Sequence, residues 1–337
     1  MKAVGYTATG PIDRDDALID FEAEKPVATG RDLLVQVRAV SVNPVDTKVR
    51  QRRAPSGDTP DILGWDAVGD VVAVGDAVTG FSPGDTVWYA GAIDRPGTNA
   101  EFHLVDERIA GHAPRTVAPA AAAAMPLTTL TAHEMLFDRL RVNDPVPGGA
   151  GTLLVIGGAG GVGSIAIQLA RALTDLTVIA TASRPDTQAW VRELGAHHVV
   201  SHAEPLGPQI TALGAGSPDF VFSTTHSDLY AQELAGLMTP QGRFGLIDDP
   251  ESFDITPFKP GSVSVHWEFM FTRPVSQTAD MERQGAILNE VAGLIDSGAV
   301  RSTATETVGT VNAANLIRAH RTIESGRARG KLVLEGF

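Results

Sequence analysis

The sequence predicts an α/β protein in which a doubly wound parallel sheet is joined to a β-rich part. Three observations predict it. Apolar strands alternate with helix-like segments from about residue 125 to 262, a glycine-rich turn joins the first of these strands to a helix, and residues 1–124 are rich in strand-like runs. Alternation of strands and helices is typical of a parallel sheet with helices on both faces.

The first part of the chain is predicted to be a β domain. Its β-branched runs at residues 33–40 and 67–74 are typical of strands, and turn signals such as those at 82–85 separate such runs.

The glycine-rich turn indicates a dinucleotide site. An apolar strand at residues 152–156 leads into Gly158, Gly160 and Gly163, which fit the pattern G-x-G-x-x-G, and a helix is expected from Ser164. Such a turn lets the backbone approach a pyrophosphate, and the amide-rich helix N-terminus faces its charge. Gly161 and Val162 complete the turn and are expected to bind the cofactor too.

The next strand, at residues 177–184, indicates which cofactor binds. An NAD-binding chain usually carries Asp or Glu about 20 residues beyond the last glycine, where it holds the ribose 2′-hydroxyl. Ser183 and Arg184 stand there instead, which favours a 2′-phosphate and therefore NADPH. The alternative for Arg184 is a solvated surface arginine.

The remaining elements follow in order. We expect a helix at 186–194, a short strand at 199–200, a strand at 219–223, a helix near 228–238 and a strand at 244–247. The tail from about 263 is predicted to hold helices at 284–296 and 313–324 and a final strand at 331–334.

Composition limits the function classes. The 337 residues are 43% hydrophobic and 20% charged, enough for a large core in two domains, and the formal net charge is −13. Nucleic acid and anionic membranes are therefore poor partners, and the basic run at 50–53 is read as a solvated loop or a cofactor contact. With no charged-then-apolar leader and no apolar stretch near 18 residues in length, a soluble cytoplasmic protein is expected.

Residue types also restrict metal chemistry. The chain has no cysteine, which excludes disulfides, thiol nucleophiles and thiolate-ligated zinc. Among its nine histidines, His197 and His198 would point to opposite faces of a strand, so they do not converge easily on one ion.

Four motifs resemble one enzyme superfamily. They are residues 41–48, residues 64–69 continuing to 84–87, residues 127–132, and the glycine turn. The chain resembles the medium-chain dehydrogenase/reductase superfamily, in its zinc-free, quinone-oxidoreductase-like branch, and most of all the subgroup labelled zinc-type alcohol dehydrogenase-like. The resemblance implies a GroES-like catalytic domain at 1–124, a Rossmann domain that binds NADPH at 125–262, a return to the catalytic domain at 263–337, and a homodimer.

The departures from zinc-dependent relatives concern the metal ligands. Those relatives carry a cysteine ligand where Asn43 stands and a His-Glu pair where Trp65 and Asp66 stand. A catalytic zinc needs three protein ligands and an open position, whereas this pattern offers at most one carboxylate. We therefore expect no metal.

Without a Lewis acid, reduction of a simple ketone would leave a localised alkoxide charge for hydrogen bonds alone to stabilise. A quinone or an α,β-unsaturated carbonyl compound spreads that charge. The sequence thus favours hydride transfer from NADPH to such an acceptor. The alternatives are a non-catalytic NADPH-binding redox sensor and a zinc-free alcohol or carbonyl reductase.

The resemblance places several candidate residues beside the nicotinamide. Asn43 and Lys48 are hydrogen-bond donors for catalysis, Asp46 holds Lys48 or backbone amides or touches substrate, and Thr131 suits the carboxamide. The alternatives are that Asn43 only stabilises a turn, that Lys48 is a surface lysine, and that Thr131 is a helix N-cap.

Other candidates line the rest of the proposed site. His202 matches an aromatic position at the adenine end, Thr224 and Ile247 are assigned to the cofactor, and Arg327 or Arg329 could close the phosphate pocket. The aromatic residues Trp65, Trp267, Phe269 and Phe271 form either an apolar substrate pocket or ordinary core.

Overall fold

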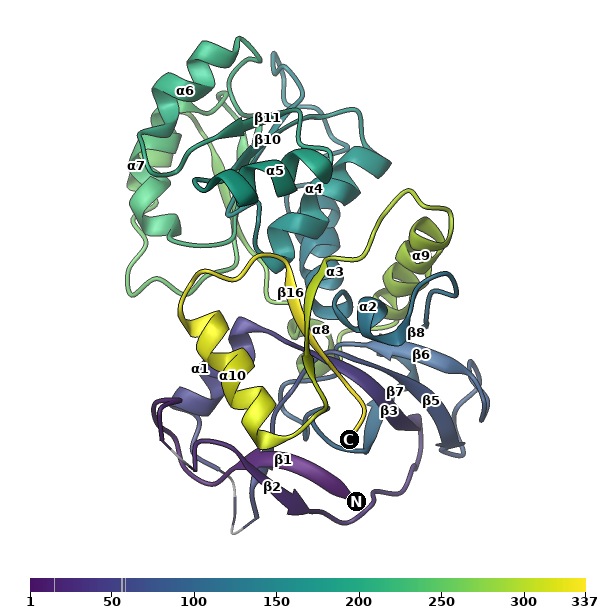
Figure 1. Cartoon of the computed structure of the whole chain (residues 1–337). Coiled ribbons are helices and arrows are strands. Elements are labelled where there is room, and N and C mark those ends of the chain that lie inside the picture. The colour runs from purple at the N-terminus through teal and green to yellow at the C-terminus, as the bar shows by residue number, and fades with distance from the viewer. Residues whose placement is uncertain (15, 56, 58) are drawn as a thin grey trace. The chain divides into compact units, whose positions relative to one another are not determined.

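The computed structural model describes residues 1–14, 16–55, 57 and 59–337 (Figure 1). The chain divides into two compact units. Unit 1 comprises Met1–Leu130 and Phe271–Phe337, and unit 2 comprises Thr131–Met270. Unit 2 is thus inserted into the sequence of unit 1.

Unit 1 is built on two sheets. The smaller has the order β2-β1-β4, with β1 (Lys2–Tyr6), β2 (Ile19–Glu22) and β4 (Asp61–Ile62) antiparallel. The larger has the order β15-β16-β3-β5-β6-β8, and β7 also pairs with β3. Its strands are β3 (Asp32–Val42), β5 (Ala67–Val74), β6 (Thr86–Tyr89), β7 (Phe102–Asp106), β8 (Ala110–His112), β15 (Ala304–Gly309) and β16 (Lys331–Glu335).

The helices of unit 1 come from both of its segments. They are α1 (Pro44–Arg52), η1 (Glu107–Ile109), α2 (Pro119–Ala123), α8 (Thr272–Ser276), α9 (Arg283–Asp296) and α10 (Ala313–Glu324). Helix α1 begins at Pro44 because proline favours the first helical position, and α10 begins where Asn312 accepts a hydrogen bond from the amide of Asn315. In Figure 1 the yellow α10 lies beside α1, so the C-terminal segment completes unit 1.

Unit 2 contains a parallel sheet of order β11-β10-β9-β12-β13-β14. Its strands are β9 (Thr152–Ile156), β10 (Thr177–Thr181), β11 (His198–Val200), β12 (Phe220–Ser223), β13 (Arg243–Leu246) and β14 (Ser264–Trp267). The connecting elements are α4 (Gly161–Leu173), α5 (Pro185–Glu193), α6 (Leu206–Leu213), α7 (Ser227–Leu237) and η3 (Thr256–Phe258). Strand order reverses between β9 and β12, where ligands of such sheets bind. Leu154, Ile179, Val221 and Phe244 belong to its buried core.

Helix α3 (Pro126–His133) carries the chain from unit 1 into unit 2. It continues as the π-helix η2 (Glu134–Arg139), a rare geometry that is often found at functional sites. In the described part of the chain, no helix is both long enough and apolar enough to cross a membrane.

The structure shifts some of the expected boundaries. Strand β14 pairs with β13, so unit 2 extends to Met270 rather than ending at residue 262. This strand has only four residues, Ser264–Trp267, so its alternation of polar and apolar side chains is too brief to indicate a strand in the sequence. Helix α4 starts at Gly161 rather than Ser164, and β10 ends at Thr181 rather than residue 184.

Candidate nucleotide site and buried polar network

The glycine turn in unit 2 is closely packed at two of its glycines. Gly157 has a φ of 74°, a left-handed conformation that favours glycine. A Cβ on Gly163 would collide with the carbonyl oxygen of Gly157 and lie 2.7 Å from Gly158 Cα, and a Cβ on Gly158 would lie 2.9 Å from Ala180 Cβ. By contrast, the nearest atom to a Cβ on Gly160 is 3.4 Å away. The backbone is therefore closely packed at Gly158 and Gly163, whereas a methyl group on Gly160 would make only an ordinary van der Waals contact.

The amides at the start of α4 belong to a helix N-terminus that directly follows this turn. The helix begins at Gly161, so Gly161, Val162 and Gly163 belong to its first turn, where backbone N–H groups have no intrahelical acceptor. Such a helix start attracts anions.

Two threonines hold the turn from neighbouring strands. The amide of Gly157 donates to Thr181 Oγ1 at 3.0 Å, and Thr224 Oγ1 donates to the carbonyl oxygen of Ile156 at 2.8 Å. Thr224 thus acts here as a support for the end of β9.

The candidates for the 2′ position follow β10. Arg184 is the residue before α5, its side chain is 44% exposed, and its Nε lies 3.4 Å from Asp186 Oδ1. His202 follows β11, and its Nδ1 is 3.3 Å from Thr181 Oγ1. Burial first, and then the charges of Arg184 and His226, lower the pKa of His202. Ser183 is half-buried. These residues therefore gather at the carboxyl ends of β10 and β11.

The other cofactor candidates are distributed over both units. Thr131 is buried in α3, and Ile247 follows directly after β13. Arg327 belongs to unit 1, between α10 and β16.

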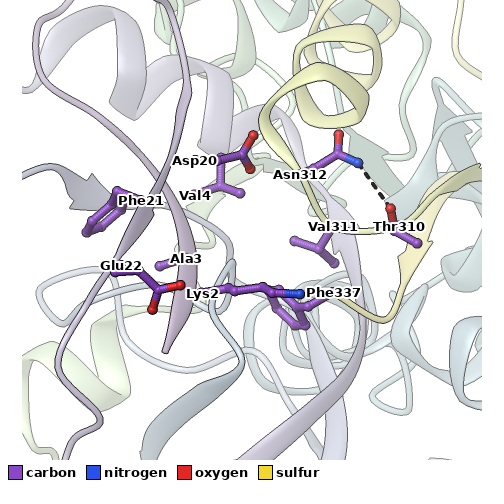
Figure 2. A pocket seen from close by; sticks show the side chains of 10 residues that line it. All are labelled: Lys2, Ala3, Val4, Asp20, Phe21, Glu22, Thr310, Val311, Asn312 and Phe337. Carbon is purple, nitrogen blue, oxygen red and sulfur yellow. Dashed lines mark hydrogen bonds between the residues drawn. The ribbon is translucent and has the colours of Figure 1, made fainter.

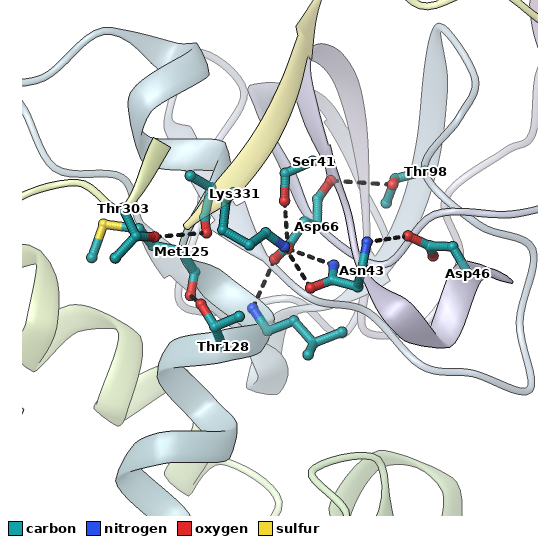
Figure 3. A network of polar contacts seen from close by, with 11 residues as sticks. Ser41, Asn43, Asp46, Asp66, Thr98, Met125, Thr128, Thr303 and Lys331 are labelled. Atoms are coloured by element: carbon teal, nitrogen blue, oxygen red, sulfur yellow. Dashed lines mark hydrogen bonds and ion pairs between the residues drawn. The ribbon is translucent and has the colours of Figure 1, made fainter. Parts of the chain in front are cut away.

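Unit 1 contains a buried polar network centred on Asp66, which is 0% exposed (Figure 3). Asp66 Oδ2 accepts from Ser41 Oγ at 2.7 Å, Asn43 Nδ2 at 2.7 Å and Lys331 Nζ at 2.9 Å. Asp66 Oδ1 accepts from the amide of Leu127 at 2.7 Å. Lys331 Nζ also donates to Asn43 Oδ1. The buried charges are therefore paired and hydrogen-bonded, as burial requires.

The predicted catalytic residues occupy different positions around this network. Asn43 is 1% exposed and is held at both ends of its amide. Asp46 Oδ2 accepts from the amide of Asn43 at 2.6 Å, and burial raises the pKa of Asp46 to about 7. Asp46 therefore holds backbone amides. Lys48 is half-buried further along α1.

Sequence reasoning missed the cation of this network. Lys331 begins a strand whose next three residues are apolar, and this is the one signal that could have marked it. A lysine with 2% exposure needs a carboxylate partner, which lies 265 positions away in the chain.

The predicted aromatic set divides into two groups. Trp65 and Phe271 are buried in unit 1, with ring centroids 6.2 Å apart, and Trp65 Nε1 donates to the carbonyl oxygen of Ala92. Trp267 and Phe269 of unit 2 are each 53% exposed. Trp65 and Phe271 thus have the surroundings of core residues.

A pocket of about 390 Å³ lies elsewhere in unit 1 (Figure 2). It is lined by β1, β2, the segment 310–312 and Phe337. None of the predicted site residues lines it.

A buried carboxyl pair in unit 2 was also missed. Glu268, which follows β14, and Glu134 of η2 are buried, and Glu268 Oε2 accepts from Arg139 Nε at 2.8 Å. Burial and the neighbouring charge of Glu134 raise the pKa of Glu268. One arginine cannot balance two carboxylates, so this pair retains a proton more readily than an exposed pair would.

Known proteins resemble the chain along its length. Residues 29–124 match the family described as Alcohol dehydrogenase GroES-like domain, and residues 194–334 match Zinc-binding dehydrogenase. A Zinc-type alcohol dehydrogenase-like protein from Staphylococcus aureus strain MSSA476 is 38% identical over 336 residues, covering 99% of both chains. A Pseudomonas aeruginosa Quinone oxidoreductase is 29% identical over 326 residues, 94% of this chain and 95% of its own.

A solved structure is also similar. It comes from Rhizobium etli CFN 42, where the protein is named as a candidate zinc-dependent alcohol dehydrogenase, and it has a TM-score of 0.98 at 60% identity, covering 100% of this chain and 98% of that chain. With the GroES-like part in unit 1 and the parallel sheet of unit 2, the chain belongs to the medium-chain dehydrogenase/reductase superfamily, and its relatives include quinone oxidoreductases.

The names of several relatives imply zinc, but the network has no free ligands for a zinc ion. The oxygens of Asp66 and Asn43 already hold the ammonium of Lys331, and a second cation there would be repelled. Trp65 offers no metal-ligating atom. Across residues that the structure describes, no group of three or more His, Cys, Asp or Glu side chains is placed to hold a metal ion. These residues do not fit zinc.

Proposed function

We propose that this oxidoreductase transfers hydride from NADPH to a quinone or an α,β-unsaturated carbonyl compound without zinc. The observation that carries the proposal is the ammonium of Lys331 on the oxygens of Asp66 and Asn43. The oxygen atoms that could ligate a metal ion already bind the ammonium group of Lys331. The chain must therefore favour a substrate that needs little electrophilic help.

The chain's own residues account for the binding of the cofactor. The amides of Gly161, Val162 and Gly163 and the open face of Gly160 suit the pyrophosphate. Ser183, Arg184 and His202 suit a phosphorylated ribose, while Thr131, Thr224, Ile247 and Arg327 remain proposed contacts. When bound, NADPH supplies a hydride at its nicotinamide ring.

The class of hydride acceptor is inferred from where negative charge develops during its reduction. A saturated ketone places the developing negative charge on one oxygen, where a metal or an oxyanion hole would be needed. A conjugated acceptor spreads it over several atoms. We propose that Lys48 donates a hydrogen bond to the acceptor. Asn43 and Asp46 then position the start of α1, on which Lys48 lies.

We also propose a homodimer. Strand β14 forms the outer edge of the sheet as far as the structure describes it, and the neighbouring Trp267 and Phe269 are each 53% exposed. An open edge beside exposed aromatic rings suits pairing with the same strand of a second copy.

The test of the cofactor assignment compares Arg184→Ala with the wild-type protein. Titration calorimetry should give an NADPH affinity at least about tenfold above that for NADH, because charge-assisted contacts contribute roughly 1.5 to 3 kcal/mol. Arg184→Ala should weaken NADPH binding and leave NADH binding nearly unchanged. Arg192→Ala, which removes an exposed arginine within α5, is the matched control. Equal wild-type affinities for the two cofactors would refute the assignment.

A further inference from the structure

One buried carboxylate in unit 1 bonds to the starts of two helices. Asp66 Oδ1 accepts from the amide of Leu127, the second residue of α3, at 2.7 Å. Asp66 Oδ2 accepts from the side chain of Asn43, the residue that precedes α1, at 2.7 Å. Asp66 itself lies directly before β5, whose first residue, Ala67, pairs with both β3 and β6. A single side chain therefore ties two helix starts to the interior of the larger sheet.

The orientation of this carboxylate is itself fixed. Ser41 Oγ at 2.7 Å and Lys331 Nζ at 2.9 Å both donate to Asp66 Oδ2 (Figure 3). Thr98 Oγ1 donates to the backbone carbonyl oxygen of Asp66 at 3.2 Å. Lys331 also donates to Asn43 Oδ1, so the amide of Asn43 is held in one orientation. All five side chains are buried, and a buried polar network whose members have partners is rigid. Asp66 therefore offers a fixed reference to both helices.

Both helices carry residues that are assigned to the proposed reaction. Lys48 lies on α1, and Thr131 lies on α3 four positions after Leu127, which is about one helical turn. Hydrogen bonds between successive turns make a helix move as a unit, so a shift at its first turn is carried to a side chain one turn further along. Such a shift matters because a displacement of about 1 Å in a reacting group can slow a reaction about a hundredfold.

We propose that Asp66 is a positioning residue for the proposed hydride transfer. It holds the start of α1, on which Lys48 lies, and the start of α3, on which Thr131 lies. This inference rests on the proposed function and adds a residue that acts through two helices rather than on the acceptor or the cofactor. The pyrophosphate and the phosphorylated ribose are assigned to other elements, around the glycine turn and the ends of β10 and β11. Loss of Asp66 should therefore slow the transfer step more than it weakens NADPH binding.

The test uses the double variant Asp66→Asn/Lys331→Met. Asparagine has nearly the size of aspartate but only one oxygen, so it cannot accept from both Leu127 and Asn43. The second substitution avoids leaving a buried ammonium without its partner. Single-turnover oxidation of bound NADPH by an enone should slow by about tenfold to a hundredfold per NADPH-binding site. The dissociation constant of NADPH and the number of binding sites, both from calorimetry, should stay close to those of the wild-type protein.

The matched control removes another buried ion pair of unit 1. Arg31 Nη1 lies 2.7 Å from Glu107 Oε1, the Glu107 side chain is 6% exposed, and in the described part of the chain neither side chain bonds to α1 or α3. Arg31→Gln/Glu107→Gln should therefore keep the wild-type single-turnover rate. Hydrogen exchange gives a second readout, because amides at the start of α1, of α3 or of both should exchange faster in Asp66→Asn/Lys331→Met and at the wild-type rate in the control.

The outcomes separate the inference from the proposed function. If the wild-type protein reduces the enone with NADPH and Asp66→Asn/Lys331→Met does so at the same rate per binding site, the inference is wrong and the proposed function stands. The inference is also wrong if the control slows as much, or if hydrogen exchange is unchanged at both helices. If the wild-type protein oxidises NADPH with no enone or quinone, the proposed function is wrong and the inference falls with it.

Discussion

At the scale of single residues, Lys331 and Asp66 carry the largest consequence. Both are buried, and the ammonium lies 2.9 Å from the carboxylate oxygen. Lys331→Met would leave Asp66 with Ser41, Asn43 and the amide of Leu127 as hydrogen-bond donors but with no opposite charge. We expect a loss of about 3 to 5 kcal/mol in the free energy of unfolding, measured by urea denaturation, because a buried carboxylate is left unpaired.

The control is the double variant Asp66→Asn/Lys331→Met. It removes both charges, so it should lose clearly less than the sum of the two single variants. Additive losses would show that the two side chains do not depend on each other, in contradiction to the network in Figure 3.

At this scale the sequence predicted some residues of the site and missed others. Gly158, Gly160 and Gly163 follow a local pattern whose geometry is set by neighbouring residues, so their arrangement could be predicted. Lys331 bonds to Asn43 across 288 positions and Glu268 to Arg139 across 129, and no local spacing encodes such pairs.

At the scale of elements, the glycine turn separates structural from binding roles. Gly163→Ala would force a methyl group against the carbonyl oxygen of Gly157 and the backbone of Gly158. Since backbone cannot move aside as a flexible side chain can, we expect unit 2 to lose stability by about 1 to 3 kcal/mol, read from thermal or urea denaturation.

Gly160→Ala is the matched comparison. The added Cβ would lie 3.4 Å from its nearest neighbour, the carbonyl oxygen of Gly157, and the φ of −71° at residue 160 suits alanine. This variant should therefore keep the wild-type free energy of unfolding. It should nevertheless weaken NADPH binding, because the methyl group enters the space proposed for the pyrophosphate. Equal losses of stability in both variants would contradict the distinction between the crowded Gly163 and the less crowded Gly160.

Elements with strong periodicity were predicted closely. The strand at 152–156 and the helix at 313–324 have the bounds that the sequence indicates. Strand β14 was missed because it has only four residues, 264–267, too few for their alternation to stand out as a strand signal. The π-helical form of η2 was not predicted from the sequence.

At the scale of the whole molecule, the insertion of unit 2 into unit 1 could not be deduced from periodicity. The expectation that residues 263–337 return to the first domain came from resemblance to the superfamily, and the contacts of unit 1 place the return at Phe271. Strand β16 pairs with β3, which explains how a C-terminal lysine reaches a site built from the first 130 residues.

The measurement that tests the central claim most directly is reduction of a matched pair of acceptors by the purified protein after exhaustive chelation. One acceptor is an enone and the other is its saturated ketone, and the hydride donor is NADPH deuterated at the transferred position. Elemental analysis of the same sample should find no stoichiometric zinc. We predict that the enone is reduced with deuterium transfer to the product, at least about tenfold faster than the ketone, since tenfold corresponds to only about 1.4 kcal/mol of barrier. Activity that disappears on chelation and returns with zinc, or a saturated ketone reduced as fast as the enone, would contradict the account.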